Sequence, residues 1–333
     1  MPRSERIPIS DAHSDLLLEL VFAEGLGEEN PLRSRWFGQL RQGGVTLQVC
    51  AVYRDPPQPG EGDGIRDLLR QVRSFHAAVE SNPEVFAVTS RADLEQASTD
   101  SVGLVLAIEG LSALGEDLWL LDLFSSLGVR VVGLTWNESN AFADGCDHEG
   151  GLTPLGERLN DRLPTVGISI DLAHASPQTV ADVLKRAPVG SVFVSHASCR
   201  AVYEHRRNLT DEQLAAIAEH GGVVCLMPHP LVVDPSEPTI DRFVDHIEHA
   251  VSVVGVDRVG LGGDFLKQIA RTLDGGHQRQ DGVEIDATLE GLDGPGDYPR
   301  LLDALRARGY SQTDVEAIAG ENLLRFFAAS PLP

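Results

Sequence analysis

The 333-residue chain is acidic, and its charge and apolar pattern exclude several classes of protein. Asp and Glu number 50 against 27 Lys and Arg, which gives a formal net charge of −23. Such a chain lacks the clustered Lys and Arg that bind a phosphate backbone, so we expect no nucleic-acid partner. No apolar run approaches the ~20 residues needed to span a bilayer, and the N-terminus lacks an apolar signal region. We therefore expect neither membrane insertion nor secretion.

The four cysteines fit a reducing compartment. Cys50, Cys146, Cys199 and Cys225 are far apart and show no C-x-x-C spacing. Cysteines in this pattern typically stay reduced in the cytosol, whereas small secreted domains pair them. The sequence therefore predicts a cytoplasmic protein with four free thiols.

Eight short β-rich segments alternate along the chain with helical patterns. Strands are expected near residues 7–13, 45–53, 103–109, 130–136, 167–174, 191–196, 222–228 and 258–264. Helices are clearest at 177–187, 211–221 and 238–255, where apolar residues recur at helical spacing and Ser, Thr or Asp stands near each start. Two further helices are expected at about 297–328.

This alternation predicts an α/β fold, a (β/α)8 barrel of the TIM type, in one domain that covers residues 1–333. Strands of nearly continuous Val, Ile and Leu are typical of a parallel sheet buried on both faces, and about eight such units close a barrel. An open doubly wound sheet is the alternative, but "GLGGDF" lacks the G-x-G-x-x-G spacing of a phosphate loop. Segment 266–296 is rich in Gly and Asp, and we expect a long loop over the barrel mouth.

Histidines and acids stand at the ends of five of the expected strands. They are His13 with Asp15, Glu109, His174, His196 and Asp264. Imidazole and carboxylate are ligands for zinc-like metals, and the chemistry of such barrels lies at the C-terminal ends of the strands. The sequence therefore predicts one metal site assembled from distant parts of the chain.

The spacing of these residues favours a binuclear site. His13 and Asp15 are two residues apart, so in a strand both side chains point to one face and can share a metal. Glu109 ends an apolar strand, where a lone buried carboxylate is costly. His174 and His196 follow consecutive strands, which favours two ligands over two core histidines. Two metals ~3.5–4 Å apart polarise a scissile carbonyl and lower the pKa of a bridging water toward ~7.

Glu109 is the expected bridge between the two metals. Only two lysines occur, Lys185 and Lys267, and neither is placed to bridge as a carboxylated lysine would. Asp264 follows a Gly pair, which allows a close approach of backbone or substrate. Near two metals this carboxylate can take a proton from the attacking water and pass it to the leaving amine.

From "DAHSDL" near the N-terminus to "GENLLR" near the C-terminus, the chain resembles the renal (membrane) dipeptidase family of zinc peptidases. The resemblance implies a barrel with two divalent metal ions, zinc in this family. It implies that His13 and Asp15 bind one metal, that His174 and His196 bind the other, and that Glu109 bridges them. It also implies that Asp264 handles the proton.

The resemblance further implies a substrate anchor and reveals one departure. Arg207, in "HRRNLTDEQL", matches the family arginine that holds the C-terminal carboxylate of the dipeptide, and a guanidinium suits a carboxylate bidentately. The family usually has a substrate-contacting histidine in its "LTH" motif, whereas "LTWNESNAFADG" places Trp136 there. Tryptophan donates one hydrogen bond but cannot accept or transfer a proton, so this change affects substrate range and rate.

Together these features predict a zinc-dependent dipeptidase that hydrolyses the peptide bond of dipeptides, L-Xaa–D-Xaa among them, by a metal-bridging hydroxide. Two alternatives stay open. One is an amidohydrolase that acts on N-acyl amino acids or lactams, and the other is a non-catalytic barrel that binds a metal or a peptide, which only Trp136 favours. The expected partner is a small dipeptide, and the resemblance suggests a homodimer.

The remaining histidines and tryptophans receive structural interpretations. His246 and His249 lie three residues apart on an expected helix and are expected on a solvated face. His229 shows no ligand spacing, and Trp36 and Trp119 are expected to pack in the interior.

Overall fold

Eight parallel strands close into a barrel in the computed structural model, which describes residues 6–54, 64–97, 100–269 and 279–333. The barrel strands are β1 (Ile9–Asp11), β2 (Val45–Tyr53), β4 (Val102–Glu109), β5 (Val129–Gly133), β6 (Ser169–Asp171), β7 (Val192–Ala197), β8 (Val224–Leu226) and β9 (Val259–Leu261). β2 pairs directly with β4, and β1 pairs with β9 through Asp11 and Leu261, which closes the ring. The predicted (β/α)8 barrel and its eight strands are confirmed.

One further strand of the same sheet lies outside the barrel and was not predicted. β3 (Val85–Ala87) pairs only with β4 among the described strands, at the N-terminal end of that strand. It therefore extends the sheet beside the barrel wall without contributing to the closed ring.

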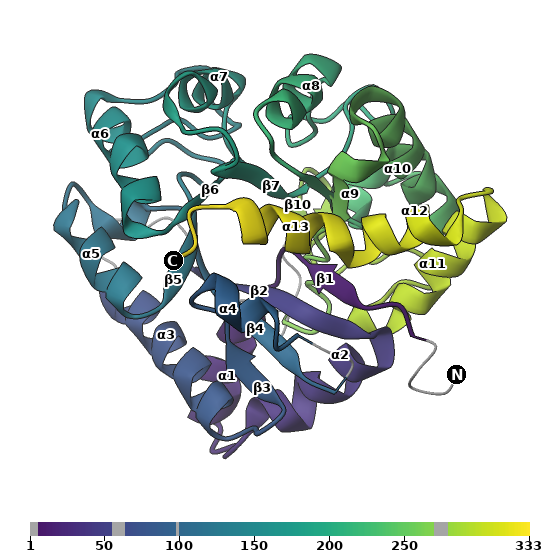
Figure 1. Cartoon of the computed structure of the whole chain (residues 1–333), viewed down its shortest axis with the longest axis horizontal. Coiled ribbons are helices and arrows are strands. Elements are labelled where there is room, and N and C mark those ends of the chain that lie inside the picture. The colour runs from purple at the N-terminus through teal and green to yellow at the C-terminus, as the bar shows by residue number, and fades with distance from the viewer. Residues whose placement is uncertain (1–5, 55–63, 98–99, 270–278) are drawn as a thin grey trace.

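Helices surround the strands as an outer layer (Figure 1). The helices are α1 (Leu16–Gly25), α2 (Phe37–Gly43), α3 (Gly64–Glu80), α4 (Arg91–Leu94), α5 (Trp119–Ser126), α6 (Pro154–Arg162), α7 (Pro177–Arg186), α8 (Asp211–Glu219), α9 (Pro230–Val233), α10 (Ile240–Val254), α11 (Tyr298–Ala307), α12 (Gln312–Glu316) and α13 (Asn322–Ala329). The predicted helices start where capping residues satisfy free N–H groups: the side chains of Ser176, Thr210 and Thr239 accept hydrogen bonds at the starts of α7, α8 and α10.

The apolar core has two main parts. One large cluster lies between the strands and the surrounding helices, and a second fills the barrel interior with residues such as Val49, Val131 and Phe193. α13 crosses one end of the barrel (Figure 1), where Phe326 and Phe327 pack on the ring of Phe193. α13 therefore covers the N-terminal end of the strands and leaves the C-terminal end for the site.

Two structural predictions about single residues are wrong. His246 is buried rather than solvated, since its ring nitrogens bond to the Cys199 backbone N–H and the Val233 carbonyl. Trp119 is 61% exposed at the start of α5 rather than packed inside. Trp36, in contrast, is buried as expected, with its indole N–H bonded to Glu19.

The segment expected as a long loop contains a short hairpin. β10 (Arg279–Gln280) pairs antiparallel with β11 (Val283–Glu284), a hairpin within this segment that the sequence did not predict, and residues 270–278 of the segment lie outside the described residues. All four cysteines are free. None of the helices in the described ranges combines the length and apolarity needed to cross a membrane.

Candidate metal centre

The C-terminal ends of five strands bring the predicted ligands together. They come from the residues after β1 (His13, Asp15), the end of β4 (Glu109), the residues after β6 (His174), the end of β7 (His196) and the residues after β9 (Asp264). Apart from the half-buried Asp15, all these side chains are buried. His174 and Asp264 adopt φ values of 64° and 40°, a left-handed backbone that non-glycine residues rarely adopt outside special sites.

The two glycines before Asp264 allow neighbouring atoms to lie close to the backbone. A Cβ atom on Gly262 would lie 1.8 Å from the Ser195 carbonyl oxygen, and one on Gly263 would lie 2.6 Å from Asp11 Oδ2. β9 therefore continues toward Asp264 only because these two positions lack side chains.

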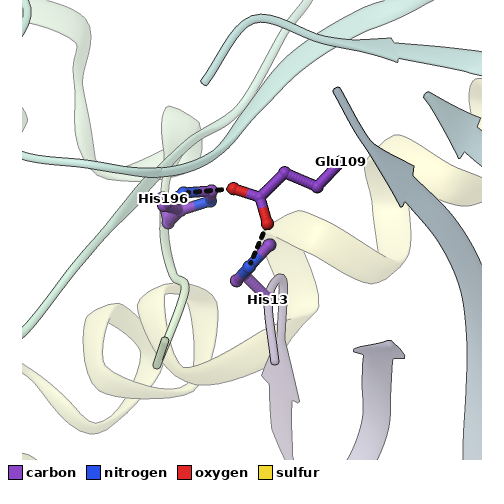
Figure 2. Close-up of side chains that lie close together, drawn as sticks. All are labelled: His13, Glu109 and His196. Atoms are coloured by element: carbon purple, nitrogen blue, oxygen red, sulfur yellow. Dashed lines mark ion pairs between the residues drawn. The ribbon is translucent and has the colours of Figure 1, made fainter. Parts of the chain in front are cut away.

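Glu109 lies between His13 on one side and His174 with His196 on the other, and Figure 2 shows it between His13 and His196. Its Oε2 atom is 3.5 Å from His13 Nε2, while its Oε1 atom is 2.9 Å from His174 Nε2 and 3.5 Å from His196 Nε2. The two oxygens of one carboxylate thus face different histidines, as a bridging ligand would.

Carboxylates surround His13. Its Nε2 atom lies 3.6 Å from Asp15 Oδ1 and 3.7 Å from Asp264 Oδ1, and it has no hydrogen-bond partner among the described residues. These distances are too long for hydrogen bonds but suit several ligands around one cation. Burial lowers the pKa of His13, but the carboxylates of Glu109, Asp15 and Asp264 together raise it well above its usual value. The carboxylates around His13 therefore favour a positive charge at this position.

Hydrogen bonds fix the tautomers of the other two histidines. His174 Nδ1 lies 2.7 Å from Asn137 Oδ1, an acceptor, so Nδ1 carries the proton. Ser195 Oγ donates to Asp171 Oδ2 at 2.5 Å and therefore accepts from His196 Nδ1 at 2.7 Å. Both Nε2 atoms then present lone pairs toward the centre.

The two Nε2 atoms lie only 2.8 Å apart. Burial lowers the pKa of His174 to about 3, and the pKa of His196 falls well below its usual value through burial and the positive charge of His13. Two neutral imidazoles whose lone pairs converge repel each other unless they share a cation, so the arrangement fits a metal ion.

The donors form two groups whose ligand atoms lie within 4.8 Å of one another. One contains His13, Glu109 and His196, and the other contains His13, Asp15 and Asp264. A set of imidazoles and carboxylates suits zinc and other divalent ions of intermediate softness. The chemistry of the cluster therefore fits the metal that the sequence predicts.

A pocket opens over the cluster, and Arg207 and Trp136 both line it. Arg207 is only 5% exposed, and its Nη2 donates to the His196 carbonyl at 3.4 Å. No carboxylate among the described residues forms an ion pair with its guanidinium. This buried cation beside the pocket is thus available to a ligand's anion.

Asp264 also lines the pocket, and its pKa is raised to about 7. Burial is the main cause; the charge of His13 opposes it, and the carboxylates of Asp15 and Glu109 reinforce it. A carboxyl group that titrates near neutrality can both accept and release a proton.

Sequence analysis missed the residues that support the ligands and one histidine of the pocket. Asp171 stands as a polar residue inside an apolar strand, which is a signal that could have revealed it, whereas Asn137 shows none. His229 lines the pocket as a neutral group, because burial lowers its pKa to about 4. Its Nδ1 accepts from the Leu231 N–H, and its Nε2 bonds to the Ile285 carbonyl.

Comparison with known proteins gives the same picture. The family model of membrane dipeptidase (peptidase family M19) matches residues 4–330. An uncharacterized dipeptidase of Schizosaccharomyces pombe is 30% identical, over 96% of this chain and 80% of that protein. The solved structure of an amidohydrolase from Pseudomonas aeruginosa is 26% identical with a TM-score of 0.75, covering 88% of this chain and 91% of that one.

A metallo peptidase from Rhodobacter sphaeroides, liganded with a phosphinate mimic of the dipeptide L-Ala-D-Ala, shares the fold. It is 23% identical with a TM-score of 0.82, and the match covers 98% of this chain and 100% of that chain. Since the family model spans all eight barrel strands and every residue of the cluster, the chain belongs to the membrane dipeptidase family and is a metal-dependent dipeptidase.

Proposed function

We propose that this dipeptidase uses two divalent ions, zinc in the first instance, held on either side of Glu109. His13 and Asp15 would hold one ion, and His174 and His196 the other. The observation that carries this proposal is the direction of the Glu109 oxygens, which lie 3.5 Å from His13 Nε2 and 2.9 Å from His174 Nε2. Two ions bound there would polarise the scissile carbonyl and lower the pKa of water toward ~7.

The chain's own residues supply binding and proton transfer. Arg207 binds the substrate carboxylate, since it is buried beside the pocket and no described carboxylate forms an ion pair with it. Asp264 lies 3.7 Å from His13 at the pocket wall, where it can take the proton of the attacking water and deliver it to the leaving nitrogen. Trp136 cannot share this task, because an indole transfers no proton.

A dipeptide panel with matched capped substrates tests the proposal. Zinc-loaded protein is expected to cleave Ala-Ala with L- or D-Ala in second place, and to lose most of that activity when the C-terminal carboxylate is amidated. Metal analysis should give two ions per chain, falling to one or none in His174→Ala. Two bound ions without hydrolysis of any carboxylate-bearing dipeptide would show the proposal to be wrong.

N-acyl amino acids are the second candidate substrates, and one observation favours them. The carboxylates among the described pocket residues are Asp15, Glu109 and Asp264, and all three belong to the metal cluster. The ammonium group of a dipeptide thus has no carboxylate reserved for it in this part of the chain, whereas an N-acyl amino acid has no such group to place. Faster cleavage of N-acetyl-Ala than of Ala-Ala would favour this second activity.

A further inference from the structure

One wall of the pocket is aromatic and lies against a proposed metal ligand. The ring centroids of Trp136 and Tyr53 are 5.7 Å apart, and the indole stacks on the His174 imidazole at 5.8 Å with an interplanar angle of 29°. The indole is half-buried and lines the pocket, and its N–H donates no hydrogen bond within the described part of the chain. Part of the ring surface therefore faces the pocket.

Another wall is aliphatic. Met227, Leu231 and Val232 form a small buried cluster, separate from the two clusters of the barrel, and Val283 of β11 packs against it. All four residues line the same pocket as Trp136. This small cluster is separate from the barrel core and lines a pocket, so we interpret it as a surface for an apolar part of the ligand.

The polar groups of the pocket are nearly all committed. Asp15, Glu109, His174 and Asp264 belong to the metal cluster, Arg207 is the proposed carboxylate anchor, and both ring nitrogens of His229 are hydrogen-bonded, which leaves chiefly the Gln280 side chain and the Trp136 N–H. A polar substrate side chain would find few partners among the described residues and would lose its hydration. An apolar side chain would instead gain by covering the two walls.

We infer that the enzyme selects substrates with a large apolar side chain beside the scissile bond, and that Trp136 determines this selection. The inference rests on the proposed function, because it concerns the side chain of a bound dipeptide. A glycine substrate leaves the indole face in water, whereas leucine or phenylalanine covers it. A histidine at position 136 would offer a smaller and more polar surface.

Two substrate series measure the preference. In Xaa-Ala and Ala-Xaa, with Xaa as Gly, Ser, Leu or Phe and both stereoisomers in second place, we expect kcat/KM to rise with apolar size. The rise from Gly to Leu or Phe should be at least about tenfold in one series, the scale of such discrimination in apolar pockets. Equal or falling values in both series overturn the inference.

Matched variants assign the preference to Trp136. Trp136→His should lower the Leu-to-Gly ratio by about tenfold, through a higher KM for the apolar substrate more than through kcat. The bound metal per chain should stay as in the wild type. Trp119→His makes the same exchange at an exposed position that does not line the pocket and serves as the control, so its ratio should not change. If Trp136→His keeps the wild-type ratio, Trp136 does not determine the selection.

Binding of inert ligands separates this inference from the proposed function. Phosphinate dipeptide mimics that carry Leu or Gly are titrated into the metal-loaded protein by calorimetry. The Leu mimic should bind at least about tenfold tighter, and Trp136→His should erase most of that difference. If no dipeptide is hydrolysed but the Leu mimic still binds tighter, the proposed function fails and the apolar selection stands. Equal binding of both mimics overturns the selection itself.

Discussion

The two sides of Glu109 hold their histidines in different ways. On one side, His174 and His196 each place Nδ1 against an uncharged acceptor, and both have depressed pKa values. On the other side, His13 lies among carboxylates and has a raised pKa. Hydrogen bonds organise one side, and charge organises the other.

This difference shows that the two oxygens of one carboxylate can face two unlike sets of histidine surroundings. A histidine oriented by an acceptor loses its direction when the acceptor is removed, whereas a histidine among carboxylates loses cation affinity when their charge is removed. Substitutions on either side should therefore fail in distinguishable ways.

The largest expected effect comes from Glu109→Gln, which removes the group that both sides share. Loss of a supporting residue behind a ligand costs ~10–100-fold, so loss of the bridge should cost at least ~100-fold in activity. We expect fewer than two metals per chain by elemental analysis. Glu116→Gln, at an exposed position, is the control. Two metals per chain and full activity in Glu109→Gln would show that the two sides do not depend on this carboxylate.

Removal of the metal should destabilise the fold, because the buried histidines and carboxylates on both sides of Glu109 then lack a cation to bind. Ligand at 100 times its dissociation constant stabilises a protein by about 2.7 kcal/mol. Chelation should therefore lower the free energy of unfolding by roughly that amount for each ion removed, measured by denaturant titration with and without EDTA. An unchanged midpoint would mean that the cluster binds no ion tightly.

Ser195→Ala should weaken metal binding on the side of His174 and His196 only. The hydroxyl that accepts from His196 Nδ1 is lost, so affinity at that side should fall ~10–100-fold, while the His13 side keeps its affinity. Competition with a chromophoric chelator would resolve the two constants. Ser191→Ala, whose hydroxyl bonds to Pro188 before β7, should change neither; equal loss at both sides in Ser195→Ala would contradict the separation.

Substitution of His246, which lies away from the metal cluster, should have the smallest effect. Burial lowers its pKa to about 4, below that of the unfolded chain, so the unfolded state takes up the proton first. Stability from this group is full above pH ~6.5 and is lost as pH falls toward 4, by about 1–2 kcal/mol at pH 5. His246→Gln should flatten that part of the unfolding free energy between pH 8 and 5, and an unchanged slope would contradict the assignment.

The barrel and the cluster could be predicted because their signals are local. Val45–Tyr53 is rich in apolar and β-branched residues, and the structure has a strand with those bounds. His196 and Glu109 follow directly from such runs, so their meeting needed only the rule that parallel strands end on one face. β3 was not predicted.

Other features depend on the path of the chain in three dimensions. Helical spacing shows that His246 and His249 share a face of α10, but it does not tell which part of that face meets the Cys199 loop. Trp119 is apolar yet lies at the exposed start of α5. Asn137 reaches His174 only through the loop after β5. For His246 and Asn137 the deciding contact is made by a residue distant in sequence.

The pairing of the first barrel strand with the last has a consequence for biosynthesis. Asp11 of β1 pairs with Leu261 of β9 and accepts from the Gly263 N–H, so the ring closes only after some 260 residues have left the ribosome. Such distant pairings form late. A nascent chain that lacks β9 carries His13 and Glu109 but not Asp264, so the site gains its proton-transfer group only after the last barrel strand has been synthesised.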